Sequence, residues 1–261
     1  MHNKFKFLAF SAACCALVNA GAAFAQDEAG SEVDAKPAVT LSGNAALVSQ
    51  YRFRGVSQSD EDLAVQAGLT ASHESGLYVS AWGSNLAGFG SFGGSNMELD
   101  IIGGFKTEVG GVTLDGGLLW YLYPGTDGTD YAEPYASISG TVGPASLKLG
   151  AAYAPKQDAI GDDDNLYVYT DAGVGIPGAP VTLKAHIGYT TGSGSTLAGP
   201  DGDYVDWLIG ADFTYKMLTL GIAYVDTDIG ATAADSFYTS GTTPGRQIVD
   251  GAAIVSLTAA F

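Results

Sequence analysis

The sequence predicts an all-β protein, an antiparallel up-and-down transmembrane β-barrel of about twelve strands. Three observations favour this class. Apolar and polar residues alternate with a period of two along most of the chain, the connections between these segments are alternately short and long, and the last residue is the aromatic Phe261. After residue 25 no apolar run approaches the roughly 18 residues of a helical span, so strands are expected to cross the membrane.

The first 25 residues have the composition of a Sec-type signal peptide. Lys4 and Lys6 precede an apolar run, and the segment ends in the small-x-small triplet 23–25. A membrane anchor would need a run of roughly 20 residues, and Ser11 stands where a lipoprotein signal has a branched aliphatic residue. Cleavage after the triplet removes both cysteines, so no thiol or disulfide chemistry is expected in the mature chain.

Composition divides the rest of the chain into two parts. Residues 26–38 are acidic, lack aromatic residues and show no period, which predicts a disordered lead-in. Residues 39–261 carry the alternation and are expected to form the outer-membrane barrel. The formal net charge of −17 argues against a nucleic-acid partner, because a phosphate backbone attracts basic surfaces.

The alternation is clearest from Leu41 to Arg54. Tyr51 and Phe53 continue the apolar face of this stretch, whereas Arg52 and Arg54 continue the polar face. We therefore expect one strand over the whole range, with the aromatic rings toward lipid and both arginines toward the interior. A loop over 55–62 and a second strand over 63–74 should follow, and Ser-Gly at 75–76 predicts a tight turn.

Ten further strands are predicted by the same pattern, at 77–85, 97–109, 112–123, 131–142, 146–154, 165–176, 181–190, 204–215, 218–226 and 249–261. The connections alternate as in outer-membrane barrels, which have short periplasmic turns and longer extracellular loops. An even strand count places both chain ends on the periplasmic side. A soluble β-sandwich is the main alternative, but that fold does not require connections of alternating length.

The final predicted strand places its larger apolar residues, Phe261 included, on one face. A terminal aromatic residue resembles the signature by which the insertion machinery recognises outer-membrane proteins. We expect Phe261 to serve as this membrane-insertion signature. The final strand should also pair with the strand that carries Tyr51 and Phe53, which would close the barrel.

The stretch from Ala46 to Asn85 resembles the opening of the TorF family of porins. Its most specific part is YRFRGVSQ at 51–58, followed by HESGLY at 73–78 and WGSN at 82–85. The resemblance implies a signal-bearing outer-membrane barrel with a channel function. It supplies no catalytic residue and no substrate, so no functional residue is carried over.

The face of each strand opposite the apolar one should line the interior and carry the charges. A basic side chain exposed to lipid near the midplane would cost about 2 to 4 kcal/mol, which favours this inward assignment. The candidate lumen residues are Arg52, Arg54, Glu98, Asp100, Asp115, Lys148, Asp171, Lys184, His186, Asp206 and Asp212. They favour a porin-like channel for passive diffusion of small hydrophilic solutes or ions through a narrow charged lumen. The alternative is a structural barrel whose charges pair and fill the lumen.

Arg52 and Arg54 stand two residues apart on the same expected face. They would form a basic ladder for an anionic solute. Alternatively, they would pair with Glu98 or Asp100 in a structural role. The excess of acidic lumen positions favours pairing, but the sequence leaves both interpretations open.

Two other classes of function are compatible with parts of the sequence. A hydrolase would use His73 or His186 as its base, but no G-x-S-x-G or H-E-x-x-H motif is present, so no enzyme activity is expected. An adhesin would act through external loops, of which 227–248 is the longest. The acidic segments 127–130 and 161–165 lack the spacing of an EF-hand loop, so neither a metal nor another cofactor is expected.

The expected partners follow from the predicted class of protein. They are the lipid and lipopolysaccharide of a Gram-negative outer membrane, the insertion machinery of that membrane and small hydrophilic solutes. The sequence leaves open whether the barrel forms a homo-oligomer.

Overall fold

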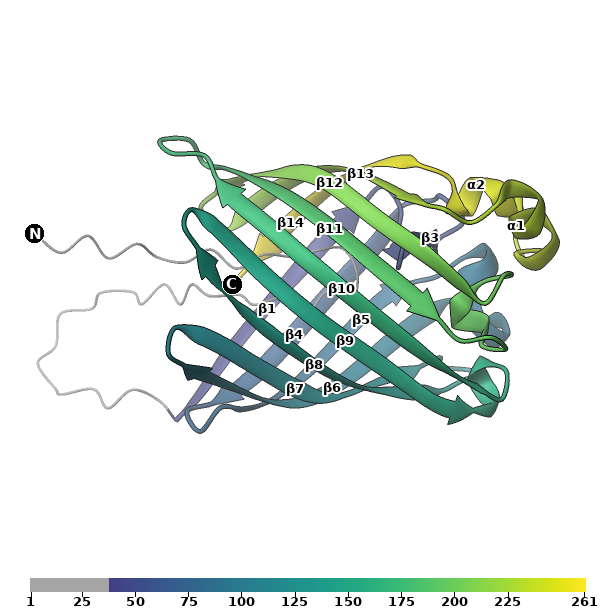
Figure 1. Ribbon diagram of the computed structural model, residues 1–261, viewed down its shortest axis with the longest axis horizontal. Helices are drawn as coiled ribbons and strands as arrows, with labels where there is room; N and C mark the ends of the chain where they lie inside the picture. The colour runs from purple at the N-terminus through teal and green to yellow at the C-terminus, as the bar shows by residue number, and fades with distance from the viewer. Residues whose placement is uncertain (1–37) are drawn as a thin grey trace, which may run out of the picture.

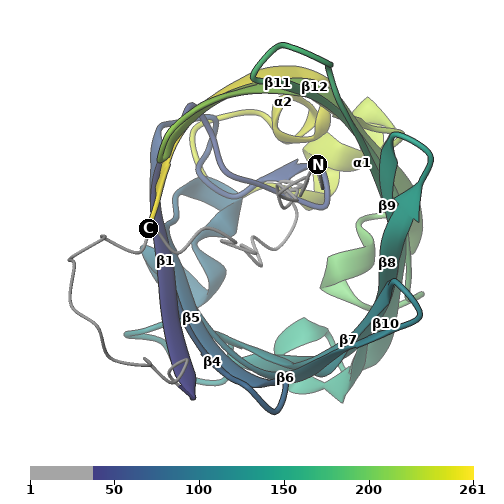
Figure 2. The ribbon, with the colours of Figure 1, turned by 90° about the vertical axis from the view of Figure 1, so that its left-hand side faces the viewer.

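The computed structural model describes residues 38–261, so the expected signal peptide and the lead-in up to residue 37 lie outside the described residues. The described chain forms one closed barrel of twelve antiparallel strands, as predicted (Figures 1 and 2). The strands of the barrel are β1 (Val39–Val48), β4 (Ala64–His73), β5 (Leu77–Asn85), β6 (Met97–Val109), β7 (Val112–Leu122), β8 (Tyr131–Val142), β9 (Ala145–Gln157), β10 (Asp163–Gly175), β11 (Val181–Thr191), β12 (Asp203–Tyr215), β13 (Leu218–Thr227) and β14 (Ala252–Ala260).

The strands follow the barrel in chain order, and β1 pairs with β14, so the predicted closure between the first and last strands is confirmed. The pairing continues one residue past β14. The amide of Gly43 donates to the carbonyl of Phe261 at 2.8 Å, and the amide of Phe261 donates to the carbonyl of Gly43 at 2.9 Å. The Phe261 ring lies over Gly43, where a Cβ would be only 2.9 Å from ring carbons. Phe261 therefore packs directly on the seam of the barrel.

The barrel exposes apolar side chains on its outside and buries polar ones inside. On β13, for example, Leu218, Leu220 and Ile222 are each more than 40% exposed. By contrast, Glu98 and Asp100 on β6 are only 3% and 4% exposed. This polarity is the inverse of that of a water-soluble protein. Within residues 38–261, no helix has the length and apolar character needed to cross a membrane.

Short and long connections gather at opposite ends of the barrel, as predicted (Figure 1). The end at which β14 finishes carries tight turns such as Gly110 and Gly111, whose φ angles of 62° and 82° fit a type I′ hairpin. The other end carries the long loops. These contain α1 (Ala231–Phe237), α2 (Gly245–Val249), η1 (Gly88–Gly90), η2 (Phe92–Gly94), η3 (Asp158–Ile160) and η4 (Thr196–Ala198).

The structure corrects the sequence prediction at the first strand. β1 ends at Val48 rather than at Arg54, and the following residues form a separate hairpin of β2 (Arg52–Phe53) and β3 (Val56–Ser57). The predicted exposure of Tyr51 and Phe53 to lipid is therefore wrong. Tyr51 is only 6% exposed and packs edge-on against Trp82, with ring centroids 5.4 Å apart. Both rings therefore lie inside the barrel, at the end that carries the long loops, which we call the mouth.

The last strand also differs from its prediction. It begins at Ala252 rather than at Val249, because the preceding residues form α2. Val249 and Ile248 are buried in a cluster with Val56 of β3, which lies inside the mouth. Contact with the hairpin thus places Val249 in the mouth instead of on the lipid face.

Candidate functional site

The hairpin β2–β3 lies inside the ring of strands rather than beside it (Figure 2). Its tip is Arg54 and Gly55, which have φ angles of 47° and 81°, as a two-residue type I′ turn requires. Glycine is required at position 55 both for its positive φ angle and because no side chain fits there. A Cβ at Gly55 would collide with the side chain of Thr227 on β13, so the tip reaches the barrel wall.

Arg54 fastens the hairpin tip to two strands of the wall. Its Nη2 donates to both carboxylate oxygens of Glu133 on β8 at 2.8 Å, and its Nη1 donates to Oδ1 of Asn165 on β10 at 2.8 Å. The guanidinium carbon also lies 4.3 Å from the centre of the Tyr167 ring. The side chains of Arg54 and Glu133 are 2% and 1% exposed, so this is a fully buried ion pair. The pair holds the hairpin across the lumen.

Arg52 points in a different direction, toward the loop 228–251. Its Nε donates to Gln50 at 2.8 Å, and its Nη1 donates to the carbonyls of Gly55, Ile248 and Asp250 at 2.8 to 3.1 Å. Burial lowers the pKa of Arg52 to about 10, although nearby carboxylates, first that of Glu61, act in the opposite direction. The guanidinium thus joins the hairpin to the end of α2. The two arginines do not form the ladder that their spacing allowed.

Asp60, which follows the hairpin, forms a second connection to the loop 228–251. Its carboxylate accepts the amide and hydroxyl of Thr242 at 2.9 Å each and the amide of Thr243 at 3.3 Å. Partial burial raises the pKa of Asp60, but these hydrogen bonds outweigh that effect and lower it below the ordinary value. Because the folded pKa is depressed, the stabilisation is fully present above the unfolded value of about 3.9 and disappears as the pH falls through the folded pKa.

We therefore expect the amides of Thr242 and Thr243 to lose protection from hydrogen exchange when the pH falls from about 5 to about 2.5. Asp60→Asn should show reduced protection at both pH values, because the neutral amide is a weaker acceptor. The measurement is the protection factor, corrected for the intrinsic pH dependence of exchange. Equal protection of wild type and Asp60→Asn at pH 5 would mean that the carboxylate does not hold this loop.

Glu98 and Asp100 lie on the inner face of β6, beside the hairpin. Glu98 Oε1 accepts the hydroxyl of Tyr51 at 2.9 Å. Neither carboxylate lies within 4 Å of a basic group in the described part of the chain, so the expected alternative of pairing with Arg52 or Arg54 is wrong. Arg54 instead pairs with Glu133, which the sequence analysis did not select.

Asp171 and Asp206 flank His186 in the middle of the barrel. Nδ1 of His186 is 2.6 Å from Asp171 Oδ1, and Nε2 is 3.2 Å from Asp206 Oδ1. The hydroxyl of Tyr167 lies 2.8 Å from Nε2 and also donates to Asp206 at 3.3 Å. Three of the predicted lumen residues are thus brought together by β10, β11 and β12.

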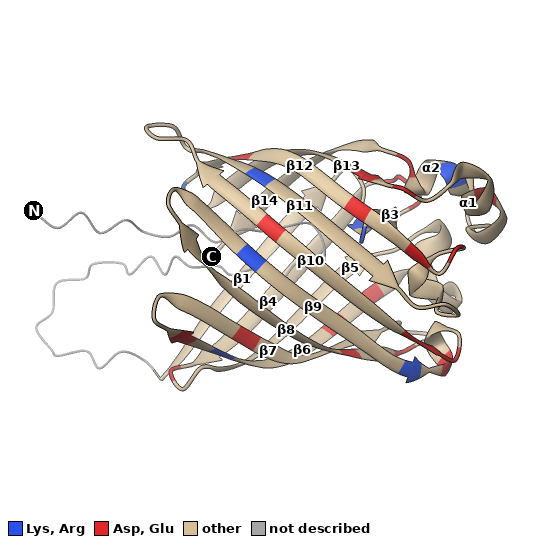
Figure 3. Cartoon of the chain, in the orientation of Figure 1, with Lys and Arg blue, Asp and Glu red and all other residues tan. Residues whose placement is uncertain are grey.

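The remaining candidates face the interior nearer the short turns, and Figure 3 shows charged positions along the length of the strands. Lys184 donates to Asp212 at 2.6 Å. Asp115 accepts the hydroxyl of Tyr78 at 2.8 Å and lies 3.9 Å from the ammonium of Lys106. Lys148 lies 5.3 Å from the centre of the Tyr169 ring. The sequence-predicted charges on the barrel strands thus lie on inner faces, and most of them form pairs or small clusters.

Inward tyrosines lie flat along the wall of the barrel, because glycines leave room for them. A Cβ at Gly104 would be 2.6 Å from the Tyr78 ring, and a Cβ at Gly150 would overlap the Tyr169 ring. Gly188 accommodates the Tyr167 hydroxyl in the same way. The rings thus cover neighbouring strands instead of standing across the lumen, which agrees with the use of aromatic side chains to cover strand glycines.

Glu133, Asn165 and Tyr167, which contact Arg54, are interior residues that the sequence pattern did not single out. Glu133 lies between Tyr131 and Tyr135 on the inner face of β8, so the period of two was a sufficient signal for its orientation. Its partner was not predictable in this way, because Arg54 reaches it across the lumen, 79 residues away in sequence.

These features define the class of the fold. A closed antiparallel barrel with an apolar outer surface and a charged interior is the fold of outer-membrane porins. The structure is similar to that of the NanC porin, with a TM-score of 0.55 and 11% sequence identity over 85% of this chain and 99% of that one. It is also similar to the KdgM porin, with a TM-score of 0.54 and 7% identity over 84% and 99% of the two chains. At such low identity the likeness concerns the fold alone.

The chain belongs to the family described as "Bacterial protein of unknown function (Gcw_chp)", which it matches over residues 32–261. No curated protein matches the sequence.

Proposed function

We propose that this protein is an outer-membrane channel through which small hydrophilic solutes or ions diffuse passively. One observation carries the proposal, namely the inverted polarity of the barrel, with apolar side chains outside and charged side chains inside. An interior that were only structural would have no need for so many ionisable groups, since burying charges is costly. The resemblance of residues 46–85 to TorF-family porins, and the barrel fold shared with other porins, support the same proposal.

The interior charges favour cations over anions. Carboxylates on the inner faces outnumber the basic groups, and Arg54 is already paired with Glu133. A few fixed charges in a narrow, low-dielectric passage have a large effect on the ions that enter it. Because the hairpin β2–β3 occupies part of the mouth, we expect a small pore rather than a wide one.

The experiment is planar-bilayer recording of the refolded barrel. We expect discrete single-channel currents and, in a KCl gradient, a reversal potential that shows a preference for potassium. Asp171→Asn should reduce this preference, because it removes a fixed negative charge from the inner face in the middle of the barrel. Folded, heat-modifiable protein that inserts but passes neither ions nor small solutes into liposomes would refute the channel.

The two other classes of function have less support. His186 is bonded to two carboxylates and a tyrosine, whereas a nucleophilic hydrolase of the usual kind places a serine, threonine or cysteine on its histidine. The loop 228–251, which an adhesin would present outward, packs Ile248 and Val249 into the mouth. We therefore propose a channel without enzyme activity, in which this loop narrows the entrance.

A further inference from the structure

We propose that the cavity enclosed by the hairpin β2–β3, the barrel wall and the long loops binds the ammonium group of a small organic cation. This inference deepens the proposed channel function by naming a class of solute. Binding at the cavity can nevertheless be measured without conduction, so the two proposals can fail separately.

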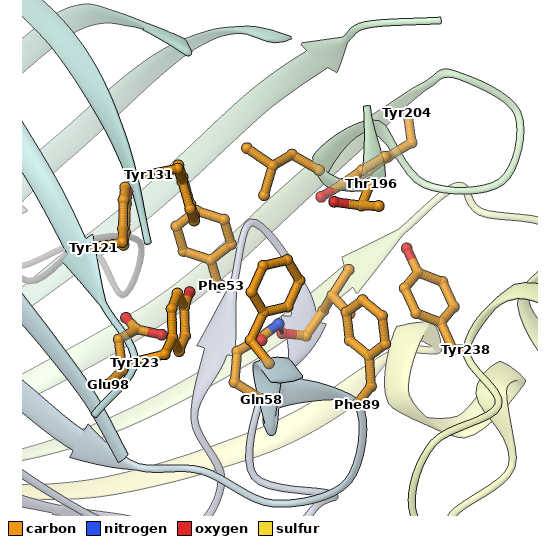
Figure 4. Close-up of a pocket in the computed structure, with 13 residues that line it drawn as sticks. Phe53, Gln58, Phe89, Glu98, Tyr121, Tyr123, Tyr131, Thr196, Tyr204 and Tyr238 are labelled. Carbon is orange, nitrogen blue, oxygen red and sulfur yellow. Dashed lines mark hydrogen bonds between the residues drawn. The ribbon is translucent and has the colours of Figure 1, made fainter. Parts of the chain in front are cut away.

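The cavity is lined mainly by aromatic rings (Figure 4). Eight of its thirteen lining residues are phenylalanine or tyrosine. The cavity volume is about 40 Å³, which is room for about three water molecules at ~10–15 Å³ each. This size suits a compact head group rather than a sugar ring.

Three lining rings, Tyr121, Tyr123 and Tyr131, are close to parallel, whereas Phe53 and Phe92 stand at an angle to them, so the space has aromatic surface on more than one side. Tyr121 and Tyr131 are stacked, with centroids 4.4 Å apart. Phe53 meets Tyr121 edge-on at 5.9 Å, and Phe92 is tilted against Tyr123 at 5.1 Å. Ring faces attract a cation through the quadrupole of the π-system, and several rings together form the cage that recognises alkylated ammonium groups.

One carboxylate, that of Glu98, lies among these rings (Figure 4). Asp100 stands two residues further along the same face of β6. It is 4% exposed, and its Oδ1 has no hydrogen-bond partner among the described residues. The cavity lining includes no basic side chain. Two buried carboxylates without a basic partner are costly, and a bound cation would offset part of that cost.

The surroundings favour an organic cation over a metal ion. Calcium takes six to eight oxygen ligands, and magnesium retains several waters in an octahedral shell. The cavity instead offers aromatic faces together with a single lining carboxylate. An ammonium group with methyl substituents satisfies both, because its charge is spread over an apolar surface.

The test is isothermal titration calorimetry of the refolded barrel with tetramethylammonium chloride, and with sodium chloride at the same ionic strength. We expect tetramethylammonium to bind at least about tenfold more tightly than sodium, since several cation–π contacts contribute. Glu98→Gln and, separately, Tyr131→Leu should each weaken binding by about tenfold or more. Asp115→Asn is the matched control, because it removes a carboxylate from the interior away from the cavity, and its affinity should equal that of wild type.

Equal heats for the two salts, or unchanged affinity in both Glu98→Gln and Tyr131→Leu, would overturn the proposed site. If Glu98→Gln does not fold, Tyr131→Leu and Phe92→Leu, which each remove one lining ring, still test whether the cavity binds tetramethylammonium. Conductance of the same preparation separates the two proposals. Currents without tetramethylammonium binding would support the proposed channel and refute the proposed site. Binding without currents would support the site and refute the channel.

Discussion

Replacing Arg54 with alanine is expected to raise the single-channel conductance by roughly twofold or more and to destabilise the barrel. The guanidinium fills the space between the hairpin tip and the wall, where it bonds to Glu133 and Asn165. Its loss opens that space and frees the tip to move. It also leaves Glu133 buried without its cation, and breaking a buried ion pair in this way costs about 3 to 5 kcal/mol.

Conductance in planar bilayers and the urea midpoint of unfolding in lipid measure the two effects. The double variant with Arg54→Met and Glu133→Gln removes both charges. We expect it to recover much of the stability, because no buried charge is left unpaired. Its conductance should lie closer to that of wild type than the conductance of Arg54→Ala does, because the methionine side chain refills part of the space.

Arg246→Ala provides the matched control for Arg54→Ala. Arg246 pairs with Asp235 at 3.0 Å, but its side chain is 56% exposed, and exposed ion pairs contribute little to stability. We expect wild-type conductance and stability from this variant. A wild-type conductance for Arg54→Ala itself would show that the hairpin does not limit the current.

Replacing Phe261 with alanine is expected to reduce the yield of folded barrel in the outer membrane severely, with a smaller loss for protein refolded in detergent. The ring covers Gly43 at the seam between β1 and β14. Removing it takes away the packing at the point where the barrel closes, together with the aromatic side chain that we expect the insertion machinery to recognise. Heat-modifiable migration in gels measures the folded fraction in both settings.

Leu257→Ala is the matched control for Phe261→Ala. Leu257 lies on the same outer face of β14 and is also an exposed apolar residue, at 46% compared with 65% for Phe261. Its loss removes lipid-facing surface but leaves the end of the seam intact, so we expect near-normal assembly. Equal defects in the two variants would show that Phe261 acts only as another lipid-facing residue.

Most of the barrel was predictable from the sequence because its strands obey one local rule. The strand over Met97–Val109 has the predicted bounds, and Gly-Gly at 110–111 forms the turn between it and the next predicted strand. Alternation also indicated the inner face for charged residues on continuous strands, such as Glu98 on β6 and Asp206 on β12. No long-range information was needed for these features.

The structure of the mouth was not predictable from the sequence, because a local pattern does not show where the chain leaves the barrel wall. The alternation of Tyr51 to Arg54 persists in the hairpin β2–β3, so a period of two alone could not show that the chain leaves the wall after Val48. The local signal for departure was Gly55, because glycine suits the second position of a type I′ turn, whereas Arg54 is not among the residues that usually occupy the first position. The partners of Arg54 depend on the curvature of the whole barrel, which brings Glu133 and Asn165 to it from other strands.

The tyrosines that lie flat on the inner wall restrict which substitutions the barrel can accept during evolution. The Tyr78 ring fills the space that a side chain at Gly104 would need, and the Tyr169 ring does the same at Gly150. A larger residue at either glycine would lift the ring away from the wall and into the path of solute. The width of the passage is thus encoded in residue pairs, and related sequences should exchange both members together or neither.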